Sequence, residues 1–160
     1  MAAVALFAAG CSKKDSGAPS QTPAQTTAAA DAAPRVIDIS ASDAMKYDVM
    51  RIEARAGETV RVVLHNTGAL PKVAMGHNFV LFKLGASVEA FAAAAATAGA
   101  AKDYFPADKM GETIAHTKLI GPKEKTEVTF KVPAEPGEYT YACTFPGHIV
   151  AGMRGVLVVK

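Results

Sequence analysis

One short segment near the C-terminus restricts the fold of this chain more than any other. It reads Cys143-Thr-Phe-Pro-Gly-His148-Ile-Val-Ala-Gly-Met153, and strand-like runs at 138–142 and 155–160 flank it. A thiolate, an imidazole and a thioether on one loop are all metal ligands. The two flanking runs predict that the loop lies between two strands.

A second imidazole stands upstream, in Met75-Gly76-His77-Asn78. Two His and one Cys with a weak Met are the ligand set of a blue-copper electron-transfer site. Two alternatives remain open at this point: a buried histidine bonded to backbone, and an inert buried thiol. Zinc would accept one Cys and two His, but Met is a poor zinc ligand. The ligand set therefore favours copper as the cofactor.

Several separated segments resemble azurin, the bacterial blue-copper protein of the cupredoxin family. They are Cys143 to His148, Met75 to Leu81, Ile114 to Gly121, and the shorter 70–72 and 102–104. The resemblance covers roughly residue 35 to the C-terminus. It implies an all-β fold, a cupredoxin Greek-key β-sandwich with a short helical flap. It also implies one type 1 copper per chain and the function of an electron carrier rather than an enzyme.

The resemblance also implies roles for individual residues. The metal ligands would be His77, Cys143 and His148, with Met153 as axial ligand and the Gly76 carbonyl turned toward the metal. Asn78 would tie the two ligand loops together, and Phe145 would pack beside the ligands. Azurin has three residues between the last His and Met, whereas this chain has Ile149, Val150, Ala151 and Gly152. Auracyanin has a similarly longer spacing, and we expect the extra residue to bulge the loop.

The resemblance extends to the other histidines and to a partner surface. His65 is expected to be a buried histidine near the site that is not a ligand, and His116 a surface or structural one. An edge of the His148 ring is expected to reach the surface as the electron port. The apolar surface around it would comprise Leu70, Met75, Pro146 and Gly147, with Ile149 and Val150 as further members. Partners implied by the family are a c-type cytochrome, a nitrite reductase or a peroxidase.

The body of the chain shows a strand-and-turn pattern. Alternating or β-branched runs predict strands at 36–39, 47–52, 59–64, 77–82, 127–132, 138–143 and 155–160. Regularly spaced strands of this kind predict an antiparallel sandwich with Greek-key connections. One Ala-rich segment, 86–99, predicts a helix that Ser87 caps and Gly99 ends. Its apolar face would be Val88, Phe91 and Ala95, and we expect its role to be structural.

The N-terminal part predicts export and anchoring. Residues 1–10 are apolar and end in Ala8-Ala9-Gly10 before Cys11, which resembles a bacterial lipobox. We expect 1–10 to be the remnant of a signal peptide whose basic start is missing. We expect 11–34 to be a lipidated Cys11 with a flexible linker, because it lacks large apolar residues, and 35–160 to be the copper-binding domain. The protein would then lie in the periplasm or outer cell envelope, held to the membrane by lipid. The alternatives are an ordinary secretory signal and a Cys11–Cys143 disulfide.

Composition narrows the functional classes. The net charge is +2 and basic residues are scattered, which argues against a nucleic-acid partner. Four histidines cannot supply the second copper centre of a nitrite reductase or multicopper oxidase, and a dinuclear copper loop needs two cysteines. Copper storage or delivery calls for labile Met-rich or His-rich runs, which the sequence lacks. Storage or delivery, and a redox module serving a copper enzyme, are the alternatives to a free electron carrier.

Overall fold

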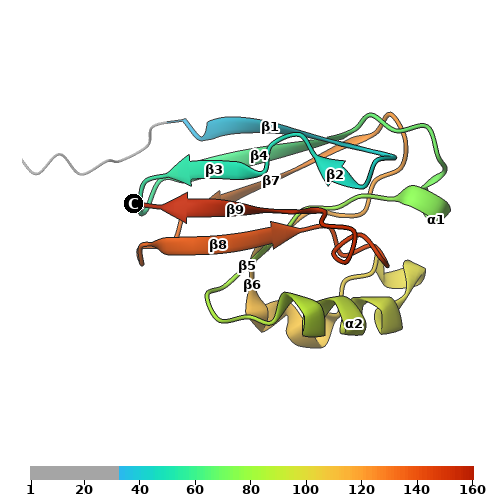
Figure 1. Ribbon diagram of the computed structural model, residues 1–160. Helices are drawn as coiled ribbons and strands as arrows, with labels where there is room; N and C mark the ends of the chain where they lie inside the picture. The colour runs from blue at the N-terminus through green and yellow to red at the C-terminus, as the bar shows by residue number, and fades with distance from the viewer. Residues whose placement is uncertain (1–32) are drawn as a thin grey trace, which may run out of the picture. The chain divides into compact units, whose positions relative to one another are not determined.

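The computed structural model describes residues 33–160, and these form a two-layered β structure (Figure 1). In chain order the strands are β1 (Arg35–Ser42), β2 (Lys46–Tyr47), β3 (Arg51–Ala54), β4 (Thr59–Asn66), β5 (Val80–Phe82), β6 (Thr113–His116), β7 (Lys125–Lys131), β8 (Gly137–Ala142) and β9 (Arg154–Val159). The helices are α1 (Lys72–Met75) and α2 (Val88–Ala98), followed by the 3-10 turns η1 (Ala100–Lys102) and η2 (Ala107–Glu112). No helix among these residues is long and apolar enough to cross a membrane.

The strands make two sheets that pack face to face. One sheet has the order β2-β1-β4-β7, and the other has the order β3-β9-β8-β5-β6. The predicted sandwich is therefore confirmed, but its purely antiparallel pairing is wrong. Strand β1 pairs with β4 in parallel, and β3 pairs with β9 in parallel. Alternation within one strand sets which side chains face the core but says nothing about the direction of its neighbour, which the connections decide.

The core lies between the two sheets and follows from the period of two in strand side chains. In β4, Val60, Val62 and Leu64 are fully buried and face inward. They belong to the same apolar cluster as Leu81 of β5 and Leu157 of β9 in the opposite sheet. The same cluster includes the cysteine and methionine of the C-terminal loop, so the loop is continuous with the core.

Helix α2 agrees with its sequence prediction at both ends. The Ser87 hydroxyl accepts a hydrogen bond from the N–H of Ala90 at 3.2 Å, which satisfies a free donor of the first turn. Gly99 ends the helix with a φ of 76°, a conformation that glycine adopts readily. The predicted strand at 77–82 begins only at Val80, and the one at 47–52 is split between β2 and β3. Strand β6 and helix α1 were not foreseen as elements.

The pairing of β5 with β8 places the two halves of the expected metal site. These strands are antiparallel, with Val80 opposite Ala142. Continuing that register past the strand ends brings the residues just before Val80 opposite those just after Ala142. His77 and Cys143 therefore meet at one end of the second sheet, although many residues separate them in the sequence.

Candidate metal centre

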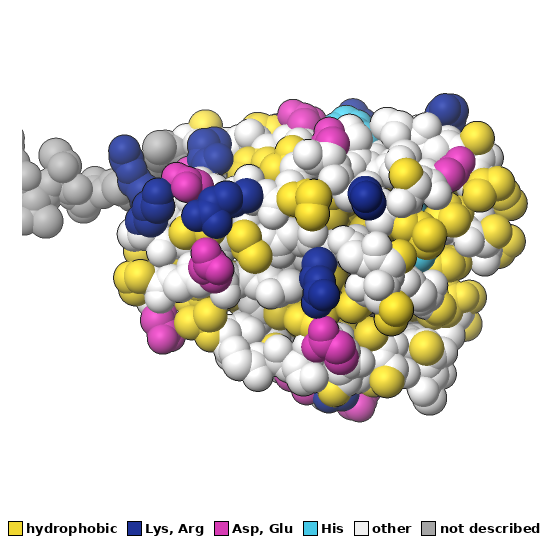
Figure 2. All heavy atoms as spheres, in the orientation of Figure 1, with side chains coloured by type: hydrophobic (Ala, Val, Ile, Leu, Met, Phe, Trp, Pro, Cys, Tyr) yellow, Lys and Arg dark blue, Asp and Glu magenta, His cyan; other side chains and the backbone are white. Residues whose placement is uncertain are grey.

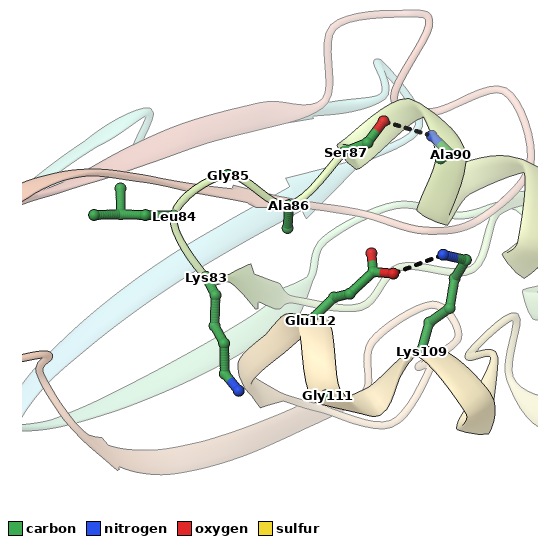
Figure 3. A pocket seen from close by; sticks show the side chains of 9 residues that line it. All are labelled: Lys83, Leu84, Gly85, Ala86, Ser87, Ala90, Lys109, Gly111 and Glu112. Atoms are coloured by element: carbon green, nitrogen blue, oxygen red, sulfur yellow. Dashed lines mark hydrogen bonds and ion pairs between the residues drawn. The ribbon is translucent and has the colours of Figure 1, made fainter.

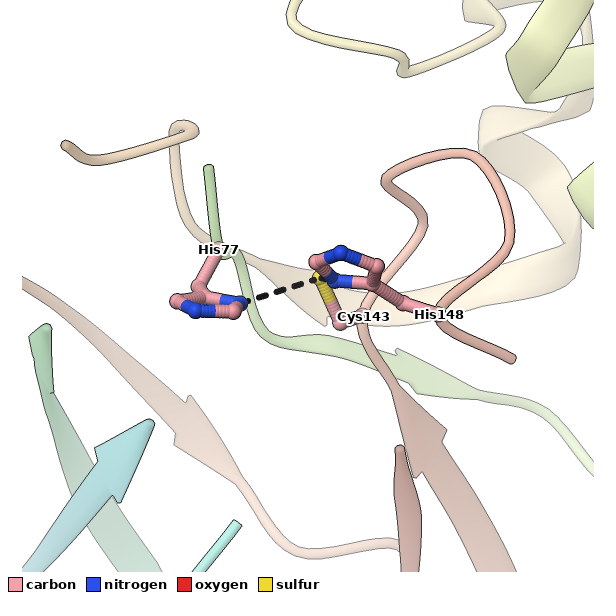
Figure 4. A group of neighbouring side chains, drawn as sticks. All are labelled: His77, Cys143 and His148. Carbon is pink, nitrogen blue, oxygen red and sulfur yellow. Dashed lines mark hydrogen bonds between the residues drawn. The ribbon is translucent and has the colours of Figure 1, made fainter. Parts of the chain in front are cut away.

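Three buried side chains converge at this end of the sheet (Figure 4): His77, Cys143 and His148. The Nδ1 atom of His148 lies 3.3 Å from the Cys143 sulfur, and Nδ1 of His77 lies 4.0 Å from it. The two imidazole rings lie with centroids 5.1 Å apart and are tilted by 41° relative to one another. One nitrogen of each ring thus points at the thiol, and the three candidate donor atoms lie within 4.8 Å of one another.

Burial disfavours charge on each of these groups in the metal-free protein. It raises the pKa of the Cys143 thiol to about 12, although the backbone N–H groups of Asn78 and Phe145 oppose the shift. It lowers the pKa of His148 to about 4, with a smaller contribution from His77. The pKa of His77 is also lowered by burial, against the charge of Asp43 and the backbone of Ser42. The site therefore holds a neutral thiol and two neutral imidazoles when it is empty.

The donor set fits a metal ion such as copper. Two ligands bonded to one ion at about 2.0 and 2.3 Å, the lengths known for His and Cys on zinc, can be at most about 4.3 Å apart. Both nitrogen–sulfur distances, 3.3 and 4.0 Å, are shorter than that. A bound cation would also remove the thiol proton, which burial otherwise retains. In addition, Nε2 of His77 is buried without a hydrogen-bond partner among the described residues.

The loop from Cys143 to Met153, which has four residues between its His and its Met, contains a hydrogen-bonded turn. The N–H of Ala151 donates to the carbonyl of Gly147 at 2.9 Å, and the N–H of Met153 donates to the carbonyl of His148 at 2.9 Å. Gly152 ends the turn with a φ of 87°, as glycine commonly does after a helical turn. The chain then returns, so that the Cys143 N–H reaches the Met153 carbonyl at 3.2 Å. Met153 is fully buried beside Cys143 in the core.

A buried network of hydrogen bonds joins the two ligand segments. The Asn78 side chain donates to Thr144 Oγ1 at 2.7 Å and accepts from the Thr144 N–H at 2.8 Å. The Tyr47 hydroxyl, from β2, donates to the Asn78 carbonyl at 2.5 Å. Sequence reasoning missed Tyr47, because nothing in a two-residue strand marks its hydroxyl as directed at this loop. Thr144 lies inside the Cys143 to His148 segment, and this position beside a candidate ligand is the sequence feature that could have identified it.

Gly76 lies against the cysteine, and the space there admits only glycine. Its carbonyl oxygen is 3.9 Å from the Cys143 sulfur, within reach of the thiol proton. A Cβ at this position would be 2.8 Å from a Leu119 side-chain carbon and 2.8 Å from the Lys72 carbonyl oxygen, a separation that is too short for side-chain carbons. The structure thus places the Gly76 carbonyl beside the Cys143 sulfur.

The surface above the centre is apolar. Figure 2 shows hydrophobic side chains gathered at the end of the domain where α1 lies in Figure 1. Of the residues expected on this surface, Leu70, Pro146, Gly147 and Val150 are exposed and Met75 is half-buried; Val73 of α1 is also exposed. His148 itself keeps only 2% of its surface exposed, so the predicted ring edge reaches solvent over a very small area.

Two expected positions on the periphery need correction. Ile149 was expected on the apolar surface, but it is 5% exposed and packs inward, whereas Val150 is 92% exposed. His65 was expected to be buried near the site. It is half-exposed on β4 with its Nε2 2.8 Å from Asp38 Oδ1, and its neighbour Asn66 is the buried residue. Adjacent residues of a strand point to opposite faces, so a shift of one position reverses the burial.

Other predicted residues lie around the centre or outside the described part. The Phe145 ring packs against His148, with centroids 4.7 Å apart. His116 is exposed on β6 and stacks on Phe105 with centroids 3.9 Å apart, which agrees with a surface histidine. Cys11 and the lipid attachment predicted for it fall outside the described residues. Cys143 is the free cysteine of the described part.

A cavity of about 400 Å³ lies away from these ligands, between the β5–α2 connection and η2 (Figure 3). Lys83, Ser87, Lys109 and Glu112 are among the residues that line it, and the Lys109 ammonium pairs with Glu112 at 2.6 Å. None of the candidate ligands lines this cavity. The candidate metal centre and this cavity are therefore separate features of the described residues.

Comparison with known proteins agrees with the geometry of the centre. The sequence model of the copper binding proteins of the plastocyanin/azurin family matches residues 35–160. Azurin from Pseudomonas chlororaphis is 41% identical over 128 residues, which cover 78% of this chain and 97% of that azurin. Azurin from Achromobacter denitrificans is 44% identical over 124 residues, which cover 74% of this chain and 80% of that protein.

Two solved structures have the same fold. Dithionite-reduced auracyanin from Roseiflexus castenholzii superposes with a TM-score of 0.70 at 35% identity, covering 81% of this chain and 99% of the auracyanin. Auracyanin A, a "blue" copper protein from Chloroflexus aurantiacus, superposes with a TM-score of 0.70 at 38% identity. The superposition covers 80% of this chain and 100% of auracyanin A. A family match over most of the chain, together with relatives at this identity, leads to one conclusion: the chain belongs to the plastocyanin/azurin family of copper-binding proteins.

Proposed function

We propose that this protein is a type 1 (blue) copper electron-transfer protein, which passes single electrons between redox partners at the cell envelope and catalyses no reaction of its own. The observation that carries the proposal is the buried convergence of the Cys143 thiol with one nitrogen each of His77 and His148. Copper bound there would supply a one-electron couple between Cu(II) and Cu(I). The family to which the chain belongs supports the same function.

Each residue of the centre has a distinct proposed role. His77 and His148 offer Nδ1 lone pairs, and Cys143 offers a thiolate. The Met153 thioether and the Gly76 carbonyl act as weak ligands that tune the potential. Backbone and side-chain hydrogen bonds hold both ligand segments, and the site is buried. The donor atoms would therefore keep their places when bound copper changed its oxidation state. Copper delivery is disfavoured by the same burial, because it requires ligands that are easily reached.

The direct test is the colour of the metal-loaded protein. Copper(II) should produce an intense blue absorption from the sulfur–copper bond, and ascorbate should bleach it. Zinc(II) should give a colourless protein, so the comparison separates the two metals that the ligands Cys143, His77 and His148 accept. A copper-loaded protein without intense blue colour would overturn the proposal.

We further propose that partners dock on the apolar surface around His148. In this proposal the surface comprises Leu70, Val73, Met75, Pro146, Gly147 and Val150, which are exposed or half-buried. It carries no charged residue of its own, and the Lys72 ammonium at its edge is paired with Asp103 at 3.1 Å. A small uncharged surface suits brief encounters with redox proteins such as a c-type cytochrome, a nitrite reductase or a peroxidase.

Met75→Lys should slow electron self-exchange between two copies of the protein by about tenfold or more, since two like charges then meet in the encounter pair. NMR line broadening in mixtures of oxidised and reduced protein measures the rate. Met110→Lys is the matched control. Met110 is exposed and precedes Thr113, which pairs with the end of β5 away from His77. Wild-type self-exchange in Met75→Lys would place the docking surface elsewhere.

Lipid attachment at Cys11 is a separate proposal, supported by the lipobox-like sequence before it. The processed protein should partition into membranes, because several acyl chains hold far more firmly than one. Cys11→Ser should release it into the soluble fraction of cells that express the full chain. Mass spectrometry of the mature N-terminus measures the modification directly, and an unmodified Cys11 would refute the anchor.

A further inference from the structure

Helix α2 and the segment that follows it contact the ligand loop along its length. Figure 1 shows α2 on the side of β8 that is opposite β9. In the middle of the loop, Ile149 is 5% exposed, because its side chain enters a small apolar cluster apart from the main core. The cluster includes Val88, Phe91 and Ala95 of α2, together with Phe82 and Ala142 of the sheet.

Residues of the same segment contact both ends of the loop. Near its start, Thr144 Oγ1 donates to the Tyr104 carbonyl at 2.9 Å. The Tyr104 ring meets the Phe145 ring edge to face, with centroids 5.0 Å apart. At the end of the loop, Arg154 pairs with Glu89 of α2 at 3.2 Å. The pair is solvent-exposed and contributes little, but it marks where the helix lies.

The backbone that delivers Tyr104 to the loop is held in an unfavourable conformation. Asp103 and Tyr104 both have a φ of 52°, which is uncommon for residues other than glycine. Asp103 is secured by its ion pair with Lys72 of α1, and its carboxylate accepts from the Leu119 N–H at 3.4 Å. Such positions persist only where the surroundings over-determine them. Here the surroundings include the helix, α1 and the ligand loop.

The helix depends on the same contacts. Its sequence is mostly alanine, and its buried residues are Val88, Phe91 and Ala95. A helix of this length takes most of its stability from tertiary packing of its apolar face. Ile149 is the residue that the ligand loop contributes to that packing. Loop and helix therefore stabilise one another through one shared cluster.

We propose that the flap, defined here as residues 88–105, is the positioning element of the ligand loop, with Ile149 as its anchor. The inference rests on the proposed function for what the loop binds, and it assigns the longer spacing between His148 and Met153 a role. The longer loop turns one aliphatic side chain into the flap cluster, next to a candidate ligand. The flap thereby keeps His148 and Met153 in place from outside the sandwich.

The test compares Ile149→Ala with Val150→Ala in the full chain. The two residues are adjacent, but Val150 is 92% exposed, so its truncation removes no packing against the flap. The first readout is amide hydrogen exchange in the metal-free protein at Ala151, Gly152 and Met153, whose N–H groups are hydrogen-bonded within the loop. Removing the anchor should speed that exchange on the order of tenfold relative to the β8–β9 ladder, because the loop then opens locally. The ladder comparison separates local opening from a general loss of stability.

In copper-loaded protein, Ile149→Ala should release copper to a chelator several-fold faster and shift the reduction potential, while Val150→Ala leaves both at the wild-type values. Ile149→Val should change copper release and the reduction potential in the same direction, but by less. This variant tests the inference if the alanine variant does not fold. Wild-type loop exchange, copper release and potential in the Ile149 variants would overturn the inference. A wild-type protein that never turns blue, but whose loop amides respond to Ile149→Ala, would refute the proposed function and leave the positioning role standing.

Discussion

Replacing Cys143 by serine should abolish the blue colour of the copper-loaded protein. The colour arises from the bond between the thiolate sulfur and Cu(II), and a hydroxyl cannot take that role. The site offers no other sulfur anion, because Cys143 is the free cysteine of the described residues. The remaining His77 and His148 can still hold copper, so we expect a weakly coloured and weakly bound metal rather than complete loss of binding.

The visible spectrum after copper loading measures this effect, and circular dichroism verifies that the variant is folded. Cys11→Ser is the matched control. It removes the other cysteine of the chain and should leave the blue absorption at full intensity. An intense blue band in Cys143→Ser would show that the sulfur ligand has been assigned wrongly.

The metal-free protein should lose stability as the pH falls from about 6.5 to about 4. Burial lowers the pKa of His148 in the folded protein to about 4, whereas an unfolded histidine has a pKa near 6.5. Between those values the unfolded chain binds more protons than the folded one, so the free energy of unfolding falls as the pH drops. The stabilisation from neutral His148 is present above pH 6.5 and is lost by pH 4, a difference of about 3 kcal/mol.

Urea unfolding of the metal-free protein at several pH values measures this slope. His148→Gln is the control variant, because it removes the titrating group and should flatten most of the dependence. His77, whose pKa burial also lowers, accounts for a remaining slope of the same sign. A metal-free wild type whose stability is constant between pH 6.5 and 4 would contradict the burial of these imidazoles. Copper loading should shift the loss of stability to lower pH, because bound metal competes with the proton for the imidazole nitrogens.

Much of the fold was readable from the sequence because it depends on local chemistry. The Ser87 and Gly99 limits of α2 follow from capping and from a positive φ. Runs of alternating residues located most of the strands. Strand β6 was missed because Thr113–His116 is too short to show a period of its own. The parallel pairing of β1 with β4 was missed because strand direction depends on how distant segments connect.

The candidate site also has features that the sequence predicts and features that only the structure reveals. The composition of the ligand set was visible in the sequence, because Cys143, His148 and Met153 share one loop and their types limit the chemistry. Which neighbouring side chains enter the core was not visible. Ile149 and Val150 are adjacent aliphatic residues, yet one is buried under α2 and the other is almost fully exposed.

The sequence by itself determined the candidate donor atoms, the strand and turn pattern and the ends of the helix. Each of these depends on residues close together in the chain. Only the tertiary structure decided that Tyr47 bonds to the Asn78 carbonyl, that Asn66 rather than His65 is buried, and that the helix packs on the ligand loop. These features depend on contacts between segments far apart in sequence. The direction of a side chain and the identity of its neighbour become defined only when both sheets and the helix have packed together.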